Sequence, residues 1–488
     1  MANQHKRGTP RTQTALLPAA IEDYVEAGSL VRLIDEYVSG LDMARLGFVK
    51  SVPAHTGRPA YAPDDLLRLY LYGYWQRLRS SRRLELECAR NLEVMWLVRE
   101  LKPDHKTIAE FRRVNAEAFG ATCAQFVRFV REVKLVGGEA AIVAVDGSKF
   151  KASASKKSVP TAEQLQKEQK RIERRIADYL AEMDEADREE DAQPQPTREQ
   201  IEEAIQKLRE RNKKLKEGQA KLEAQPSQEE ANARISLTDP DCVMLSGNGS
   251  SVAGYNVQHA VDTRHKLIVA HEVTTLRNDH ASLEPMSSQA KHALAVESLT
   301  VVADGGYMNG EQSGKCEACG ITPVVPMSAV TQTRHPGSYP KSMFSYDETT
   351  DTYRCPAGEL LRRYKRDRQK RVDFYWTAAC ESCPSKPLCT NAQRRTIRRS
   401  WFAAAAERAA ARARERPQLM RLRSATAEHP FGNLKAMMPG GFSVRTLPKV
   451  RGEMALAVLT YNLKRTANIL GSTALSKELR AARAFGRA

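Results

Sequence analysis

Apolar residues recur at helical spacing through most of the first 136 residues. The run 63–72 begins with a proline and two aspartates and then continues with apolar residues at helical spacing. A second helix is predicted through Trp96, and Asp104 stands where the N-cap of a third helix over 106–114 would lie. We therefore expect an all-helical region over residues 1–136.

Polar turns separate these predicted helices, and one turn carries the basic residues Arg79, Arg82 and Arg83. Short helices joined by tight basic turns are typical of helix-turn-helix DNA-binding regions. A helical bundle whose charges are merely solvated would show the same pattern. The pattern alone favours neither interpretation.

The pattern changes at residue 140, where short apolar runs replace the helical periodicity. Residues 140–145 are rich in Ala, Ile and Val and end at Asp146, which indicates a buried strand. The turn 263–265 would join the next two strands as an antiparallel pair, and a helix is expected over 280–295. The four further strands are predicted over 254–262, 266–273, 299–303 and 322–326. The sequence thus predicts a mixed α/β domain with a five-stranded sheet.

A highly charged insertion over 156–235 interrupts this sheet and contains two heptad runs. The stretch 192–196 contains two prolines and must break the helix between the runs. A helical hairpin is predicted, and we favour packing within the chain over a dimer interface as the use of its apolar seam. The heptad positions are Leu165, Ile172, Ile176, Tyr179 and Met183 in the first run, and Ile201, Ile205, Leu208, Leu215 and Leu222 in the second.

The charge balance narrows the class of partner. The chain has 488 residues with 76 Lys and Arg against 59 Asp and Glu, a formal net charge of +17. This favours a polyanion, and nucleic acid is preferred to a membrane surface because no strongly amphipathic basic terminal helix is evident. A helix that spans a bilayer needs about 20 consecutive apolar residues, and no apolar run approaches this length. The N-terminus is too polar for a secretory signal. We expect a cytoplasmic protein.

Two aspartates follow predicted strands and precede glycines, Asp146 before Gly147 and Asp304 before Gly305. Ligands commonly bind where strands of an α/β sheet end, and Mg²⁺ takes one or two carboxylates plus substrate phosphate. An Asp-Gly turn used twice would explain the pair about equally well. A two-metal site needs a third carboxylate, for which Glu428 is the best candidate.

Six short segments occur along the chain: 145–148 (Val-Asp-Gly-Ser), 254–258 (Gly-Tyr-Asn-Val-Gln), 302–307 (Val-Ala-Asp-Gly-Gly-Tyr), 428–432 (Glu-His-Pro-Phe-Gly), 448–453 (Pro-Lys-Val-Arg-Gly-Glu) and 460–465 (Thr-Tyr-Asn-Leu-Lys-Arg). Together, and in this order, these segments resemble a DDE transposase of a bacterial insertion sequence. In many relatives the glutamate belongs to a Y-x2-R-x3-E-x6-K pattern, and Lys435 fits its final lysine. Positions 421 and 424 depart from the pattern, and Arg421 or Arg423 could supply the guanidinium instead.

The resemblance implies an RNase H-like fold with Asp146 on the first strand, Asp304 just after the fourth and Glu428 on a later helix. It implies that these carboxylates hold two Mg²⁺ or Mn²⁺ ions, which support in-line displacement at phosphorus. The implied partner is double-stranded DNA, both terminal inverted repeats and target, bound by a homodimer at the DNA ends. The N-terminal helices would recognise the repeats. The residues expected to contact DNA are Arg79, Arg82, Arg83, Lys149, Lys151, Arg421, Arg423 and Lys435.

Four of the nine cysteines form a second candidate metal site, a CxxC with two outlying thiols. Four thiolates suit a tetrahedral structural Zn²⁺, and a branch of these transposases carries a similar cluster. Unligated cysteines and a redox CxxC are the less favoured alternatives. The stretch 355–400 has few apolar residues, so we expect its folding to depend on metal. The four are Cys355, Cys380, Cys383 and Cys389.

Basic residues are densest between 361 and 425, where there are eighteen Lys and Arg and five Asp and Glu. Such a stretch binds phosphates without sequence preference. The expected division of the chain is a helical region (1–136), an RNase H-like catalytic domain (137–155 and 236–330), a charged hairpin (156–235), a cysteine-rich zinc-ribbon-like insertion (331–400) and a helical end that carries the glutamate (401–488).

The expected function is that of a transposase that binds the ends of its own element and cuts and joins DNA. Two alternatives remain: a catalytically inactive DNA-binding protein of transposase descent, and an RNase H-like nuclease that does not transfer strands. A divalent-metal cleavage assay distinguishes a transposase from the inactive DNA-binding protein. Analysis of the products distinguishes it from a nuclease that does not transfer strands.

Overall fold

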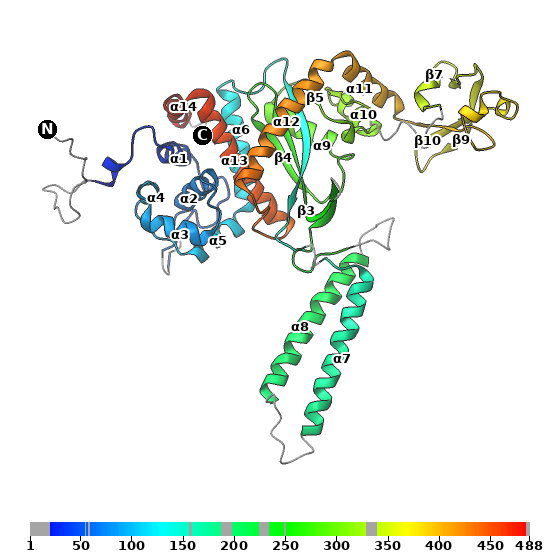
Figure 1. Cartoon of the computed structure of the whole chain (residues 1–488). Coiled ribbons are helices and arrows are strands. Elements are labelled where there is room, and N and C mark those ends of the chain that lie inside the picture. The colour runs from blue at the N-terminus through cyan, green and yellow to red at the C-terminus, as the bar shows by residue number, and fades with distance from the viewer. Residues whose placement is uncertain are drawn as a thin grey trace, which may run out of the picture. The chain divides into compact units, whose positions relative to one another are not determined.

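The chain forms two compact units in a computed structural model (Figure 1). Unit 1 comprises Met1–Phe129, Ala436–Met438 and Gly452–Ala488, and unit 2 comprises Val130–Lys435 and Pro439–Arg451. The structure describes residues 20–484 except 54, 57–58, 156–158, 187–197, 224–233, 248–249 and 328–338.

Unit 1 is helical, as the apolar periodicity predicts. Asp104 caps the helix that follows it, accepting hydrogen bonds from the amides of Lys106 (2.9 Å) and Thr107 (3.0 Å). The helix expected through Trp96 is instead two helices, because the Asn91 side chain caps a new one. The helices are α1 (Leu30–Ser39), α2 (Pro63–Trp75), α3 (Ser81–Arg90), α4 (Leu92–Leu97), α5 (His105–Val114), most of α6 (Ala116–Glu132), most of α13 (Leu447–Leu470) and α14 (Ser472–Ala484).

The division of the chain differs from the expected one at its C-terminal end. Residues 452–488 belong to unit 1 rather than to the unit that contains the sheet. The reason is close packing: a Cβ on Gly452 would come within 2.5 Å of Ala116 Cα. Glu453 is fully buried among side chains of unit 1.

Unit 2 is built on a mixed sheet of six strands, one more than expected. The order is β2-β3-β1-β5-β6, and β4 also pairs with β3. Strand β1 is antiparallel to β3 and parallel to β5, and β5 is parallel to β6. The strands are β1 (Ile142–Lys151), β2 (Val243–Gly247), β3 (Ser250–Asp262), β4 (Ile268–Thr274), β5 (Leu299–Val302) and β6 (Ile321–Val324).

The prediction was wrong about the end of β1, and it missed β2. Strand β1 does not stop at Asp146 but continues to Lys151, because all six of these residues pair with β3. Strand β2 was missed, since it is short and pairs only with Ser250–Gly254 at the beginning of β3. Both β1 beyond Asp146 and the whole of β2 are defined by pairing with β3, which the periodicity of a single segment does not show.

Four further helices of unit 2 accompany this sheet: α9 (Leu283–Leu294), α10 (Gly310–Ala318), α11 (Ala403–Glu415) and most of α12 (Pro417–Met437). One buried cluster joins α11 and α12 to the central strands. The small Ala413 and Ala427 side chains pack with Ala144, Val302 and Val324. Alanine at these contacts lets the helices approach closely, which brings α12 near the end of the apolar part of β1.

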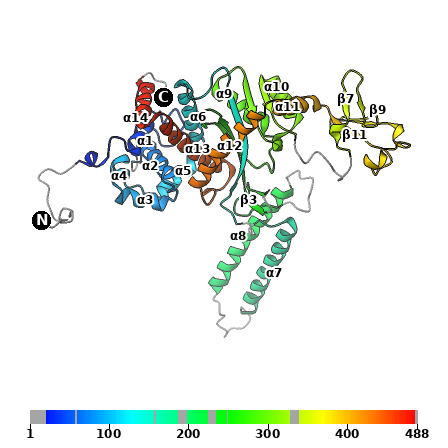
Figure 2. The same cartoon turned by 45° about the horizontal axis from the view of Figure 1, so that its top comes forward.

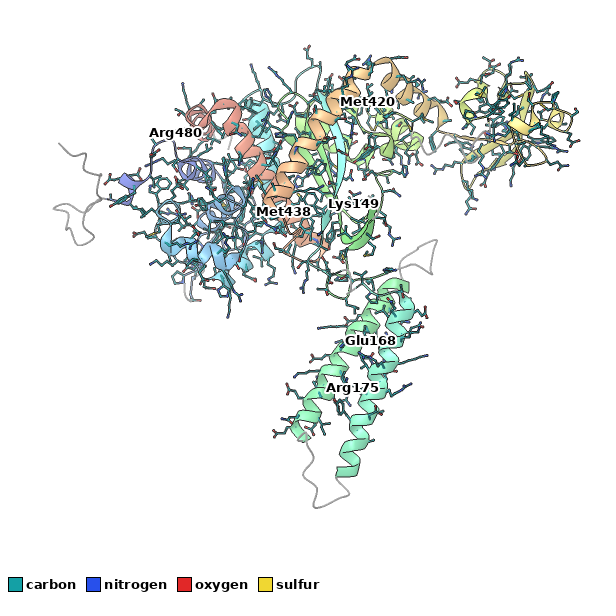
Figure 3. All side chains as sticks on the ribbon, in the orientation of Figure 1. Lys149, Glu168, Arg175, Met420, Met438 and Arg480 are labelled. Atoms are coloured by element: carbon teal, nitrogen blue, oxygen red, sulfur yellow. The ribbon has the colours of Figure 1, made fainter. Side chains whose placement is uncertain are left out.

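The charged insertion is a pair of helices, α7 (Ala162–Ala186) and α8 (Arg198–Glu223), which lie side by side in Figures 1 and 2. Their heptad residues Leu165, Ile172 and Leu215 are buried in one cluster, so the seam is used within the chain. Glu168, which Figure 3 labels, forms ion pairs at 2.8 Å with Arg171 of α7 and Arg211 of α8. The proline-containing stretch 192–196 lies outside the described residues.

A second, smaller sheet of unit 2 is antiparallel, in the order β11-β10-β9-β8-β7. We expected too few apolar residues here for a core, and this was wrong, because Phe344 and Tyr353 from before Cys355 contribute. They are buried with Leu361, Tyr375 and Ile397. The strands are β7 (Ser345–Asp347), β8 (Thr352–Arg354), β9 (Leu360–Asp367), β10 (Val372–Trp376) and β11 (Ile397–Ser400).

None of the helices in the described ranges is long and apolar enough to cross a membrane.

Candidate active site

Asp146 and Asp304 lie just beyond the point where the parallel pairing of β1 with β5 ends. Ala144 on β1 pairs with Val302 on the parallel strand β5. Asp146 and Asp304 each follow two residues later, so they are neighbours. Each carboxylate accepts a backbone hydrogen bond with Oδ1, Asp146 from Gly147 N (2.9 Å) and Asp304 from Gly306 N (2.8 Å). This leaves both Oδ2 atoms available to a common partner.

That partner is a guanidinium from α12. Arg423 Nη1 lies 3.6 Å from Asp146 Oδ2 and 3.8 Å from Asp304 Oδ2. The nitrogen is buried and has no hydrogen-bond partner among the described residues. A positive group thus occupies the space between the two carboxylates without binding tightly to either. Arg421, the other arginine considered in the sequence, is exposed.

The electrostatics of Asp146 reflect this position. Burial raises the pKa of its carboxyl to about 6, and the charges of Asp304 and Asp279 act in the same direction. Arg423 and the hydrogen bond from Gly147 N oppose the rise in pKa but do not cancel it. The ionised carboxylate is therefore destabilised in the folded protein, as is common where a site is built to receive a cation.

Replacing Asp146 by asparagine is expected to stabilise the protein in the presence of a chelator. Because the folded-state pKa lies above the unfolded value, the cost of ionising Asp146 is absent below about pH 4 and complete above about pH 6. Two pKa units correspond to about 3 kcal/mol. Thermal unfolding in EDTA should show Asp146→Asn gaining up to this amount at pH 8 relative to pH 4. An equal effect at both pH values would contradict the expectation.

Gly147 is needed beside Asp146 because three side chains crowd its α-carbon. A Cβ there would collide with Gln258 Nε2 and lie 2.8 Å from Asp279 Oδ1 and 3.1 Å from Tyr307 Oη. These groups form one network: Asp279 Oδ1 accepts from Gln258 Nε2 (2.6 Å) and Asn256 Nδ2 (2.8 Å), and the Tyr307 hydroxyl donates to Gln258 Oε1. The network joins β3, the connection after β4 and the segment after β5.

Asp279 is a candidate residue that the sequence analysis did not identify. Its charge raises the pKa of both Asp146 and Tyr307, so it belongs to the same cluster of carboxylates. It lies in the connection between β4 and α9, close to the end of a strand. A carboxylate shortly after a predicted strand was the available signal.

Glu428 is not brought into this cluster. It lies on α12 five residues after Arg423, is exposed, and makes no hydrogen bond or ion pair with any described residue. Within the described ranges, no group of three or more His, Cys, Asp or Glu side chains is arranged to hold a metal ion. The structure therefore unites two of the three expected carboxylates.

The residues expected to contact DNA differ in exposure. Arg79 does not suit the role, because its side chain is only 13% exposed and lies 3.5 Å from the buried Glu453. Lys149, labelled on β1 in Figure 3, donates to the Ser246 carbonyl. The Lys435 ammonium lies 5.9 Å from the centre of the Phe150 ring. The exposed members are Arg82, Arg83, Lys151, Arg421 and Lys435.

The four cysteines of the second candidate site converge. Cys355, Cys380, Cys383 and Cys389 line one pocket beside the small sheet. Burial raises the pKa of the Cys389 thiol, and the three other cysteines raise it further against the opposing charge of Arg395. Four thiols are the ligand type that a structural zinc takes, but no group of three or more His, Cys, Asp or Glu among the described residues, these cysteines included, is arranged to hold a metal ion.

Comparison with protein families identifies the class. A model described as Transposase domain (DUF772) matches residues 19–114, and one described as Transposase DDE domain matches residues 239–463. The second match contains Asp304 and Glu428, whereas Asp146 precedes it. The chain is a transposase. It belongs to the DDE transposases of the insertion-sequence type.

The other comparisons add little. No curated protein matches the chain. Among solved structures, the cryo-EM structure of a piggyBac transposase synaptic complex with hairpin DNA is similar at a TM-score of 0.32 and 10% sequence identity. The match covers 93% of this chain and 77% of that chain.

Proposed function

We propose that this transposase binds the ends of its own insertion sequence and catalyses metal-dependent cleavage and transfer of DNA strands. The observation that carries the proposal is the convergence of Asp146 and Asp304, from adjacent parallel strands, on a position that already holds a positive group. Carboxylates placed in this way are acceptors for a hard cation.

The topology supports an RNase H-like catalytic domain. With the additional strand β2 set aside, the order is β4-β3-β1-β5-β6. Asp146 then lies on the first strand in chain order and Asp304 directly after the fourth, which is where the resemblance placed them. Both positions follow from strand pairing rather than from the motifs.

The donor set suits Mg²⁺ or Mn²⁺, because Asp146 and Asp304 supply the one or two carboxylates that such an ion takes beside substrate phosphates. When bound, the ions would lower the pKa of the attacking water and stabilise charge at the reacting phosphate. Glu428 remains the proposed third carboxylate on the strength of its motif. Asp279 is the alternative that the structure offers, because its charge raises the pKa of Asp146.

The remaining groups of the site have roles that need no ion. Arg423 balances the two carboxylates, and its unpartnered Nη1 could donate to a phosphate oxygen of bound DNA. The exposed basic residues would hold double-stranded DNA through its backbone. A homodimer on the two ends would place one such site at each end.

The decisive experiment is cleavage of DNA that carries the sequence flanking the gene. Expected are Mg²⁺- or Mn²⁺-dependent nicks at inverted repeats and joined products with a target plasmid. Binding without cleavage would establish the inactive DNA-binding alternative, and hydrolysis without joined products would establish the nuclease alternative. Scrambled flanking sequence is the control.

We also propose that Cys355, Cys380, Cys383 and Cys389 bind a structural Zn²⁺. Elemental analysis is expected to find about one zinc per chain, with sulfur coordination. Because the small sheet has a core of its own, a chelator should loosen the loops that carry the cysteines more than the strands. Limited proteolysis with and without chelator measures this. Absence of zinc, with identical cleavage patterns, would contradict the proposal.

A further inference from the structure

The two faces of the small sheet differ in how their cations are neutralised. On the face that covers the core, the arginines have acidic partners: Arg366 pairs with Asp373 at 2.8 Å, and Arg399 with Glu407 at 2.6 Å. Arg363 lies 2.7 Å from Asp351 on the same face. These three side chains are accounted for by the fold.

The opposite face presents cations without such partners. Arg362, Lys365 and Arg398 are exposed, and none of them lies within ion-pair distance of a described carboxylate. Strand pairing places Lys365 and Arg398 on either side of Phe374, and Arg362 opposite Trp376. A run of unneutralised charge on one face is not needed for folding, and it favours a polyanion.

Aromatic rings lie between these cations. The ring centres of Phe374 and Trp376 lie 6.4 Å and 5.7 Å from that of Tyr364, which is 52% exposed. Lys365 Nζ and the Arg398 guanidinium lie 5.7 Å and 5.8 Å from the centre of the Phe374 ring. The Arg394 guanidinium lies 4.1 Å from the Trp376 ring, although it also pairs with Glu381.

A β-bulge creates this arrangement. The register between β9 and β10 shifts, so that Lys365 faces Phe374 while Arg363 faces Tyr375. Tyr364 is the extra residue and joins the outer face, although strict alternation would place only every second residue there. The irregularity adds an aromatic ring to a surface that already has two.

We propose that this outer face, Tyr364, Phe374 and Trp376 framed by Arg362, Lys365 and Arg398, binds single-stranded DNA without sequence preference. Rings that are open to solvent stack on bases, and the cations between them contact the phosphates. A duplex would use only the charges, because its base faces are covered by stacking. The inference goes beyond cleavage, since it requires neither a metal ion nor the catalytic carboxylates.

The test measures binding of fluorescein-labelled dT20 to the full-length protein, purified with zinc and assayed in EDTA-free buffer without Mg²⁺. Tyr364→Ala is expected to weaken binding about tenfold, and Tyr364→Phe, which keeps the ring, should bind like the unmodified protein. Arg398→Gln should weaken binding and reduce its salt dependence by about one phosphate contact. A 20-base-pair duplex should be much less sensitive to Tyr364→Ala.

Two matched controls accompany these variants. Tyr24→Ala removes another tyrosine, 58% exposed in unit 1, and Arg174→Gln removes an exposed arginine on α7. Both should leave dT20 binding unchanged. The proposal is overturned if dT20 does not bind, if Tyr364→Ala binds it normally, or if that variant weakens duplex and dT20 binding equally. Cleavage of end DNA is measured separately, so failure here leaves the proposed function untouched.

Discussion

Replacing Asp146 or Asp304 by asparagine is expected to abolish DNA cleavage while binding of end DNA persists. Asparagine keeps the size of the side chain and its hydrogen bond to the backbone, so the fold should be retained. It removes the charge that would hold the metal ion. Losing several kcal/mol of charge stabilisation corresponds to about a thousandfold or more in rate.

The measurement is a time course of strand nicking with Mg²⁺ and with Mn²⁺, next to a gel-shift assay on the same DNA. Asp178→Asn, which removes an exposed carboxylate on α7, is the control and should cut normally. Full activity in either Asp146→Asn or Asp304→Asn would remove that residue from the site.

The same assay decides between the two candidates for the third carboxylate. Glu428→Gln is expected to be inactive if α12 turns Glu428 toward the site when DNA and metal bind. Asp279→Asn is expected to be inactive if the cluster observed around Gly147 is already the catalytic arrangement. A variant that nicks at the normal rate excludes its residue.

Removing the carboxylate of Glu453 is expected to lower the free energy of unfolding strongly. Its side chain is completely buried, accepts a hydrogen bond from the Tyr74 hydroxyl (3.1 Å) and lies 3.5 Å from Nη1 of both Arg79 and Arg112. Glu453→Ala would leave two largely buried guanidinium groups without this partner. Breaking a buried ion pair in this way costs about 3–5 kcal/mol.

Thermal and urea unfolding of Glu453→Ala measure this effect. The matched control is Glu478→Ala on the exposed surface of α14, for which a change below about 0.5 kcal/mol is expected. Glu453→Gln, which can still accept hydrogen bonds, should fall between the two. A Glu453→Ala protein as stable as the control would mean that the arginines find other partners.

A large loss of stability in Glu453→Ala would also explain why a glutamate ends the segment 448–453. In the sequence, its glutamate stands out only as part of a family resemblance. In the structure, that glutamate joins α13 to the helices of the N-terminal region. These contacts within unit 1 give the glutamate of the motif a structural role.

The sequence by itself determined those features that depend on near neighbours in the chain. The start of α2 at Pro63, the cap at Asp104 and the paired heptads of α7 and α8 follow from local spacing. The strands β3 and β4 and their antiparallel pairing follow from alternation around a short turn. The order of the motifs was enough to indicate the family. The matches to two transposase domains support it.

Only the tertiary structure decided which distant residues meet. The register of β1 with β5 brings Asp146 beside Asp304, and the packing of alanines on the sheet places Arg423, rather than Arg421, between them. The same folding leaves Glu428 exposed and adds Asp279. Periodicity describes one element at a time, whereas this site is made where four segments cross. Their relative positions depend on strand register and side-chain volume, which no local pattern specifies.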